Sequence, residues 1–171
     1  DACLVGSEMC IRDRFLDVQT KIIINNKGTI DKYMGDCIMA FWNAPLDCKD
    51  HAELAVKSAL EVLDATQKLN EELSPLNLPP INVGIGISTG ECIVGNMGSE
   101  IRFDYSVIGD AVNLGARLEG QTRNYDGVDL LLSERTYHLC PSRAFKEIDK
   151  ILVKGKSEKV RIYTPLETNP T

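Results

Sequence analysis

The sequence has few of the residues that build metal or disulfide sites. Its two histidines, His51 and His138, lie far apart, and its six cysteines include no C-x-x-C pair. A structural zinc site needs four such ligands at characteristic spacings, so none is predicted. No secretory signal is found at the start of the sequence, so we expect free thiols in a reducing compartment, the cytoplasm.

Long apolar runs and concentrated positive charge are also missing. No stretch approaches the roughly 20 apolar residues that a membrane-spanning helix needs. The net charge is -6, and no basic stripe is present to bind a phosphate backbone, which argues against nucleic-acid partners. The 171 residues, 43% hydrophobic and 26% charged, suit a single soluble globular domain.

Neither of the common phosphate-binding loops is present. The sequence has no Walker A motif, and Gly84, Gly86 and Gly90 have the spacing G-x-G-x-x-x-G. These glycines lie in a strand-turn-strand pattern with no helix to receive a pyrophosphate, which excludes a Rossmann dinucleotide site. We therefore expect them to allow a bend and a close approach between backbones.

The residue pattern that is present predicts an α+β domain. A helix ends over Phe15–Asn25, and a long packing helix covers Asp47–Leu73 with Asp47 or Asp50 as its N-cap. Between them, Ile30–Met34 and Cys37–Trp42 form a β-hairpin around the turn Gly35-Asp36. Further strands are predicted over Ile81–Ile87, Glu91–Val94, Ile101–Val107, Val128–Leu132, Phe145–Val153 and Lys159–Tyr163.

A second polar cluster lies in YSVIGDAVNLGARLE, Tyr105 to Glu119, where a strand enters a helix near Gly109-Asp110. Asn113 and Arg117 are four residues apart and share one helix face, so an amide and a guanidinium can address the same ligand. Taken alone, the segment leaves an alternative open, in which Arg117 only reaches toward solvent or Glu119.

The first fourteen residues, DACLVGSEMCIRDR, do not fit the residue pattern of the remaining chain. The string CLVGSEMCIRDR resembles translated sequencing-adapter sequence, so we interpret 1–14 as a foreign leader, 15–165 as the domain and 166–171 as a loose tail. The DNA around codon 14 tests this interpretation, because genomic reads that pass through it without adapter sequence would overturn it.

Three ordered segments together resemble the class III nucleotidyl cyclase catalytic domain. They are GTIDKYMGDCIMAFWNAP (Gly28 to Pro45), INVGIGISTGECIVGNMGSEIRFDYSVIGDAVNLGARLEG (Ile81 to Gly120) and ILVKGK (Ile151 to Lys156). The resemblance runs from about Phe15 to Tyr163. It implies a ferredoxin-like α+β fold, an antiparallel-rich sheet with packed helices, whose first strand is missing from this chain. It also implies the formation of cyclic AMP or cyclic GMP from a nucleoside triphosphate.

The resemblance implies that one group of cationic and polar residues contacts the ribose and phosphates and that another contacts the purine. The asparagine that matches Asn113 orients the ribose, and the arginine that matches Arg117 stabilises charge on the α-phosphate during ring closure. Lys154 matches the lysine that contacts the terminal phosphates. Lys32 and Ser106 occupy the two positions that read the purine.

The metal site is only half present. In the family, two aspartates hold two Mg²⁺ ions, with Mn²⁺ as an alternative, and Asp36 matches the second of them. The first lies in a pattern like F-x-D-I-x-G-F-T, which has no match here and by the family's spacing falls before residue 1. Asp31 and Asp110 are acidic neighbours that we interpret as a solvated turn residue and a helix N-cap.

The purine residues predict ATP as the substrate. Adenine offers an acceptor at N1 and a donor at N6, whereas guanine offers the reverse, so a Lys32 donor with a Ser106 acceptor suits adenine. Guanine-selective members of the family place glutamate and cysteine at these positions. A serine hydroxyl can also donate, so some use of GTP stays open.

The resemblance further implies a head-to-tail homodimer, because in the family the metal aspartates and the asparagine-arginine pair of one site come from opposite domains. The native protein is expected to carry an upstream sensory or membrane region. Two alternatives are open: a non-catalytic cyclase-like dimerisation or nucleotide-binding module, and a guanylate cyclase.

Overall fold

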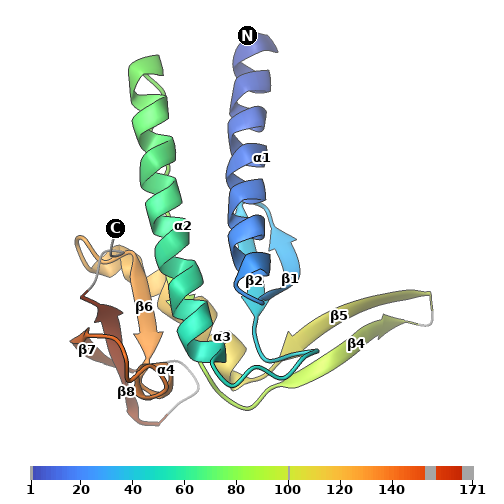
Figure 1. The fold of residues 1–171 in the computed structure, drawn as a ribbon, viewed down its shortest axis with the longest axis vertical. Coiled ribbons are helices and arrows are strands. Elements are labelled where there is room, and N and C mark those ends of the chain that lie inside the picture. Colours follow the sequence, from blue (N-terminus) through green and yellow to red (C-terminus); the bar gives the residue numbers. More distant parts are fainter. Residues whose placement is uncertain (1, 100, 153–156, 167–171) are drawn as a thin grey trace.

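The computed structural model describes residues 2–99, 101–152 and 157–166. Two long helices, α1 (Ala2–Asn25) and α2 (His51–Leu73), rise side by side from the rest of the domain (Figure 1). Residues 2–14 form the first part of α1, so the helix predicted over Phe15–Asn25 begins earlier in the chain. None of the described helices combines the length and apolar character of a membrane span.

The predicted hairpin is confirmed and contains an irregularity. Strands β1 (Thr29–Met34) and β2 (Cys37–Phe41) pair antiparallel around Gly35, whose φ of 65° is in the left-handed region that favours glycine. The pairing passes from Ile30↔Ala40 to Lys32↔Met39, so Asp31 has no partner of its own. This two-against-one arrangement is a β-bulge, which changes the direction of a side chain.

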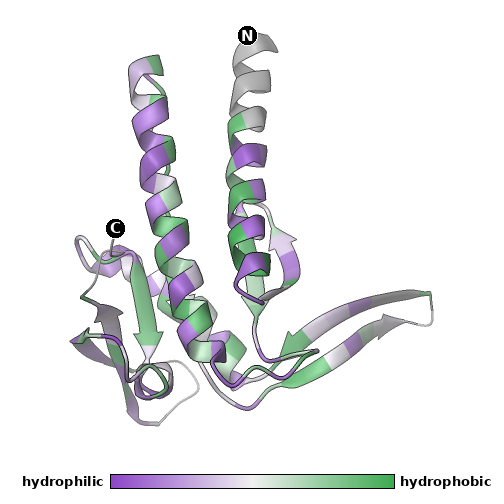
Figure 2. Cartoon of the chain, viewed as in Figure 1, coloured by the Kyte–Doolittle hydropathy of each residue, from purple (hydrophilic) through white to green (hydrophobic). Residues whose placement is uncertain are grey.

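The central sheet has the order β3-β6-β8-β7. Strand β3 (Ile85–Ile87) pairs parallel with β6 (Leu130–Ser133), and β8 (Lys159–Pro165) pairs antiparallel with both β6 and β7 (Phe145–Leu152). All four residues of β6 are buried. The strand is therefore covered on both faces, and it is strongly apolar over its first three residues (Figure 2).

Alternate residues of β6 face two different helices. Leu130 and Leu132 pack with Val56 and Leu60 of α2, whereas Leu131 packs with the buried leucines of α3 (Asp110–Gln121). Successive strand side chains point to opposite faces, so one short strand anchors a helix on each side of the sheet. The core of the domain lies in these two layers, and α3 is held against the sheet.

Strands β4 (Ile93–Ser99) and β5 (Arg102–Ile108) form a separate two-stranded ribbon that extends away from the body of the domain (Figure 1). Their pairing runs from Ile93↔Ile108 to Ser99↔Arg102. The prediction of a strand over Glu91–Val94 was thus wrong at both ends. The strand begins at Ile93, and it continues through Gly95 and Gly98 because these residues pair with β5.

Other predicted boundaries also differ from those observed. The strand predicted over Ile81–Ile87 is confined to Ile85–Ile87, since the backbone N–H and C=O of Ile81 bond to the Asn70 side chain at 2.7 and 2.8 Å rather than to a strand. Helix α2 begins at His51 with Asp50 as its N-cap, and the Asp50 side chain makes no capping hydrogen bond. Three short helices were not predicted: Ser74–Leu76, Thr122–Asn124 and α4 (Glu134–His138).

Candidate active site

The structure brings the two predicted purine-reading residues to a single carboxylate, that of Asp31. The Ser106 Oγ lies 2.8 Å from Asp31 Oδ2 and 3.0 Å from Oδ1, and the Val107 backbone N–H donates to Oδ2 at 3.1 Å. On the other side, Lys32 Nζ is 3.7 Å from Asp31 Oδ1. One carboxylate therefore holds a hydroxyl from β5 and an ammonium from β1.

The interpretation of Asp31 as a solvated turn residue was wrong. Its side chain is only 1% exposed, while the neighbouring Lys32 side chain is 51% exposed. The β-bulge provides the reason, because Asp31 is the extra residue of β1 and its side chain contacts β5 rather than solvent. A buried carboxylate is stable only with hydrogen-bond partners, and here the Ser106 hydroxyl and the Val107 amide supply them.

Asn113 and Arg117 share one face of α3, as the four-residue spacing predicted, and both are exposed. The opposite side of the helix is fixed by the buried residues Leu114 and Leu118. Asp110 is the first helical residue, and Gly109 is the N-cap, so the prediction of Asp110 as the cap was wrong by one residue. A carboxylate in the first turn still complements the helix dipole.

Close packing of α3 on the sheet depends on Gly86, as the sequence predicted for the glycines of this segment. A Cβ at Gly86 would overlap the Gly115 carbonyl oxygen and the Glu119 amide nitrogen, and would lie 3.0 Å from the Leu118 carbonyl carbon. All three are backbone atoms of α3. The missing side chain therefore sets the distance between α3 and β3, and with it the position of the exposed polar pair.

The predicted metal residue, Asp36, is exposed in the turn between β1 and β2. Among the residues that the structure describes, no group of three or more histidine, cysteine, aspartate or glutamate side chains could hold a metal ion. Asp36 thus fits a metal site as one oxygen ligand, and it does not complete one. The predicted phosphate-binding residue Lys154 lies outside the described residues.

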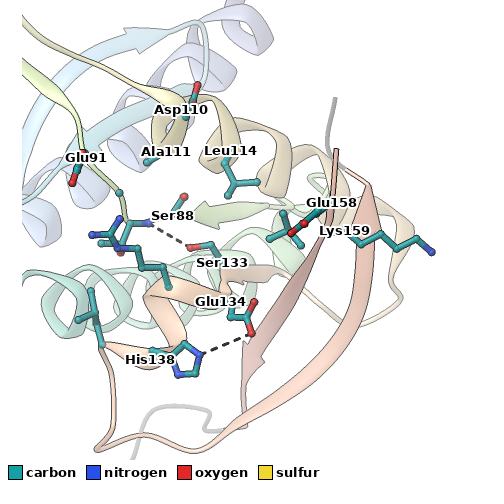
Figure 3. A pocket seen from close by; sticks show the side chains of 15 residues that line it. Ser88, Glu91, Asp110, Ala111, Leu114, Ser133, Glu134, His138, Glu158 and Lys159 are labelled. Carbon is teal, nitrogen blue, oxygen red and sulfur yellow. Dashed lines mark hydrogen bonds and ion pairs between the residues drawn. The ribbon is translucent and has the colours of Figure 1, made fainter. Parts of the chain in front are cut away.

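One cavity of the domain lies elsewhere. It has a volume of about 950 Å³ and lies between the loop after β3, the start of α3, helix α4 and the start of β8 (Figure 3). The Ser88 Oγ at its wall is buried without a hydrogen-bond partner among the described residues, and the Thr89 N–H donates to Ser133 Oγ at 3.4 Å. Of the predicted site residues that the structure describes, none lines this cavity. They lie on the exposed sides of α3 and the hairpin turn or around Asp31.

Comparison with known proteins agrees with these features. The family model of the adenylate and guanylate cyclase catalytic domain matches residues 15–165. An adenylate cyclase of Anabaena cylindrica is 41% identical over 158 residues, and adenylate cyclase 1 of Rhizobium meliloti is 33% identical over 150 residues. Each alignment covers 87% of this chain, and the chain spans 30% and 22% of the length of these relatives.

Solved structures show the same fold. The adenylyl cyclase CyaB from P. aeruginosa has a TM-score of 0.87 at 30% identity, covering 96% of this chain and 84% of that one. The guanylyl cyclase Cya2 has a TM-score of 0.79 at 32% identity, covering 92% and 79%. The α+β class III cyclase fold predicted from the sequence is confirmed, and the chain belongs to the adenylate and guanylate cyclase catalytic domain family.

Proposed function

We propose that this domain is an adenylate cyclase, which converts ATP to 3′,5′-cyclic AMP and pyrophosphate for intracellular signalling. The observation that carries the proposal is the cluster of Lys32, Asp31 and Ser106, in which an ammonium and a hydroxyl, the two groups proposed to read the purine, contact one carboxylate. Relatives named adenylate cyclases, at 33% and 41% identity, support the same substrate.

The reaction needs positioning and positive charge more than covalent catalysis. The ribose 3′-hydroxyl attacks the α-phosphorus, and the bond to the departing pyrophosphate breaks in line with that attack. We assign orientation of the ribose to Asn113 and stabilisation of the charge on the α-phosphate to Arg117. Their shared exposed face on α3 supports this assignment, and Lys154 is proposed to contact the terminal phosphates.

Base recognition depends on hydrogen-bond polarity. The Lys32 ammonium, 51% exposed at its side chain, is free to donate to N1 of adenine while it stays near Asp31. The Ser106 oxygen accepts from the adenine 6-amino group. Guanine would present an N–H to Lys32, and two donors would then face each other.

We propose that Asp36 contributes one oxygen ligand to Mg²⁺, or to Mn²⁺ in its place. Magnesium in phosphate-transfer sites is held by one or two carboxylates together with substrate oxygens and water, so a single exposed aspartate suits part of such a site. When bound, the ion would neutralise phosphate charge. Among the described residues, no group of three or more histidine, cysteine, aspartate or glutamate side chains is placed to hold the ion.

A head-to-tail homodimer would bring Asp36 of one copy to Asn113 and Arg117 of the other. The β4–β5 ribbon supports such an assembly, because two strands paired only with each other are barely stable in isolation. Its isoleucines are open to solvent: Ile93 is 74%, Ile101 96% and Ile108 59% exposed. A second copy would cover this apolar surface and enclose the site.

The test is cyclic nucleotide production by the full native reading frame, with ATP and GTP compared in Mg²⁺ and in Mn²⁺. We expect cyclic AMP as the main product. The double substitution Lys32→Glu and Ser106→Cys should lower ATP use and raise GTP use, because it reverses the donor and acceptor pattern. Cyclic GMP as the main wild-type product would identify a guanylate cyclase instead.

The incomplete metal ligand set favours one other candidate, a non-catalytic cyclase-like module. It would dimerise and bind nucleotide, and it would release no cyclic product. The same assay separates the two functions when nucleotide binding and molecular mass are measured alongside. Binding and dimerisation without any product, in either metal, would establish the module.

A further inference from the structure

The contact between Asp31 and Ser106 bears on which way the serine hydroxyl donates. A hydroxyl carries one proton and two lone pairs, so a serine that rotates freely can accept from adenine or donate to guanine. A carboxylate without its proton is an acceptor only. With Asp31 2.8 Å away, the Ser106 proton is directed to the carboxylate, and the outward side of the oxygen keeps only lone pairs.

The surroundings hold the pair in this arrangement. Ser106 is 7% exposed and the Asp31 side chain 1% exposed, so water hardly competes for either group. Ser106 and Val107 are consecutive residues of β5, and the Val107 N–H donates to the same carboxylate at 3.1 Å, which fixes its orientation. The bulge in β1, a strand that contacts β5 without pairing with it, supplies the carboxylate.

We propose that Asp31 is a positioning residue for substrate specificity: it takes the Ser106 proton, and so makes Ser106 an acceptor toward the purine. Asp31 itself would not touch the base. A 6-amino group then meets a lone pair, whereas a 6-oxo group meets a second acceptor and is rejected. The inference rests on the proposed function, in which Ser106 faces the purine.

The experiment compares ATP with purine riboside 5′-triphosphate, which lacks only the 6-amino group. Because N1 is unchanged, the Lys32 contact is the same for both substrates. In the full native protein we expect ATP to be preferred about tenfold in kcat/KM, the value of one net hydrogen bond. Asp31→Leu is similar in size but has no acceptor, so the hydroxyl proton is free to turn toward the base, and the preference should fall severalfold.

Ser106→Ala provides the matched background. It should abolish the preference by itself, and adding Asp31→Leu to it should change the ratio no further, because no hydroxyl remains to be directed. A merely structural Asp31 would give a different result. Its replacement would lower kcat/KM for both triphosphates by the same factor, and an unchanged tenfold ratio in Asp31→Leu would overturn the proposal.

A second measurement covers the case in which Asp31→Leu does not fold. The wild-type protein is assayed with 6-methoxypurine riboside triphosphate, which keeps N1 as an acceptor and adds an acceptor oxygen at position 6. If the hydroxyl is directed to Asp31, kcat/KM should be lower for this analogue than for purine riboside triphosphate. The same ratio in Ser106→Ala measures the steric effect of the methoxy group alone, and the decrease in the wild type should be severalfold larger. Equal or better use would show that the hydroxyl donates.

Binding affinities for the same triphosphates allow the cyclase activity and the role of Asp31 to be tested separately. Absence of turnover with every triphosphate would overturn the cyclase function. The inference is then decided by binding alone: the ATP preference in affinity should fall in Asp31→Leu, and its persistence at the wild-type value there would overturn the role of Asp31.

Discussion

Replacing Gly86 by alanine tests how tightly α3 is packed on the sheet. The new Cβ would overlap two backbone atoms of α3, the Gly115 carbonyl oxygen and the Glu119 amide nitrogen, and would lie 3.0 Å from the Leu118 carbonyl carbon. Backbone atoms cannot be relieved by a change of side-chain rotamer. The helix has to move away from β3.

The cost can be estimated from what that movement disturbs. Overpacking of a dense core costs about 1 to 3 kcal/mol. Displacing α3 also loosens its contacts with the sheet, where Leu118, Leu131 and Ile162 are all 0% exposed. We therefore expect Gly86→Ala to lower the free energy of unfolding by about 2 to 4 kcal/mol. Cyclase turnover should fall as well, because Asn113 and Arg117 move with the helix.

Urea denaturation of the two forms, with the midpoint compared at constant m-value, measures this cost. Gly120→Ala is the matched control, because Gly120 lies in the same helix and a Cβ there meets nothing within 4 Å. That change should raise stability by roughly 0.5 to 1 kcal/mol. A Gly86→Ala protein within about 0.5 kcal/mol of the wild type would refute the tight contact between β3 and α3.

Two further predictions concern the dimer and a buried thiol. Arg117→Ala should lower kcat with little change in KM. Mixing equal amounts of the Arg117→Ala and Asp36→Asn proteins should restore up to about a quarter of wild-type activity, because about half of the dimers are then mixed and each mixed dimer has one intact site of two. No recovery of activity in the mixture would contradict the head-to-tail assignment. Burial raises the pKa of the Cys140 thiol from 9.0 to about 11, so the unfolded chain ionises first and stability should fall between pH 9 and 11, by up to roughly 2 to 3 kcal/mol. Urea denaturation at pH values from 8 to 11 should show this fall in the free energy of unfolding of the wild type and a smaller fall in Cys140→Ala. Equal dependence of the free energy on pH in the two proteins would exclude the effect.

Local patterns were sufficient for much of the fold. The hairpin around Gly35-Asp36, the long helix ending at Leu73 and the helix that carries Asn113 and Arg117 were all predicted, because each is encoded by spacing within a few residues. The ends of the strands were less predictable. The strand expected from Ile81 is shortened by the Asn70 side chain, which is eleven residues away and takes the place of a neighbouring strand.

The proposed site divides in the same way between what the sequence predicted and what it did not. Its residue types, a lysine, a serine, an aspartate and an asparagine-arginine pair, were visible in the sequence because they lie in ordered motifs. Asp31 was not recognised as part of it. A bulge depends on the pairing of two strands, and the same residue in a regular strand or an open turn would have been the solvated aspartate that the sequence indicated.

The sequence by itself determined the kinds of element, the glycines that allow close approach and the chemical groups at the site, because periodicity, turn residues and side-chain chemistry are local properties. Only the tertiary structure decided the burial of Asp31 and the direction of the Ser106 hydroxyl. Those depend on a contact between residues 75 positions apart, which forms when β1 and β5 meet in the folded domain.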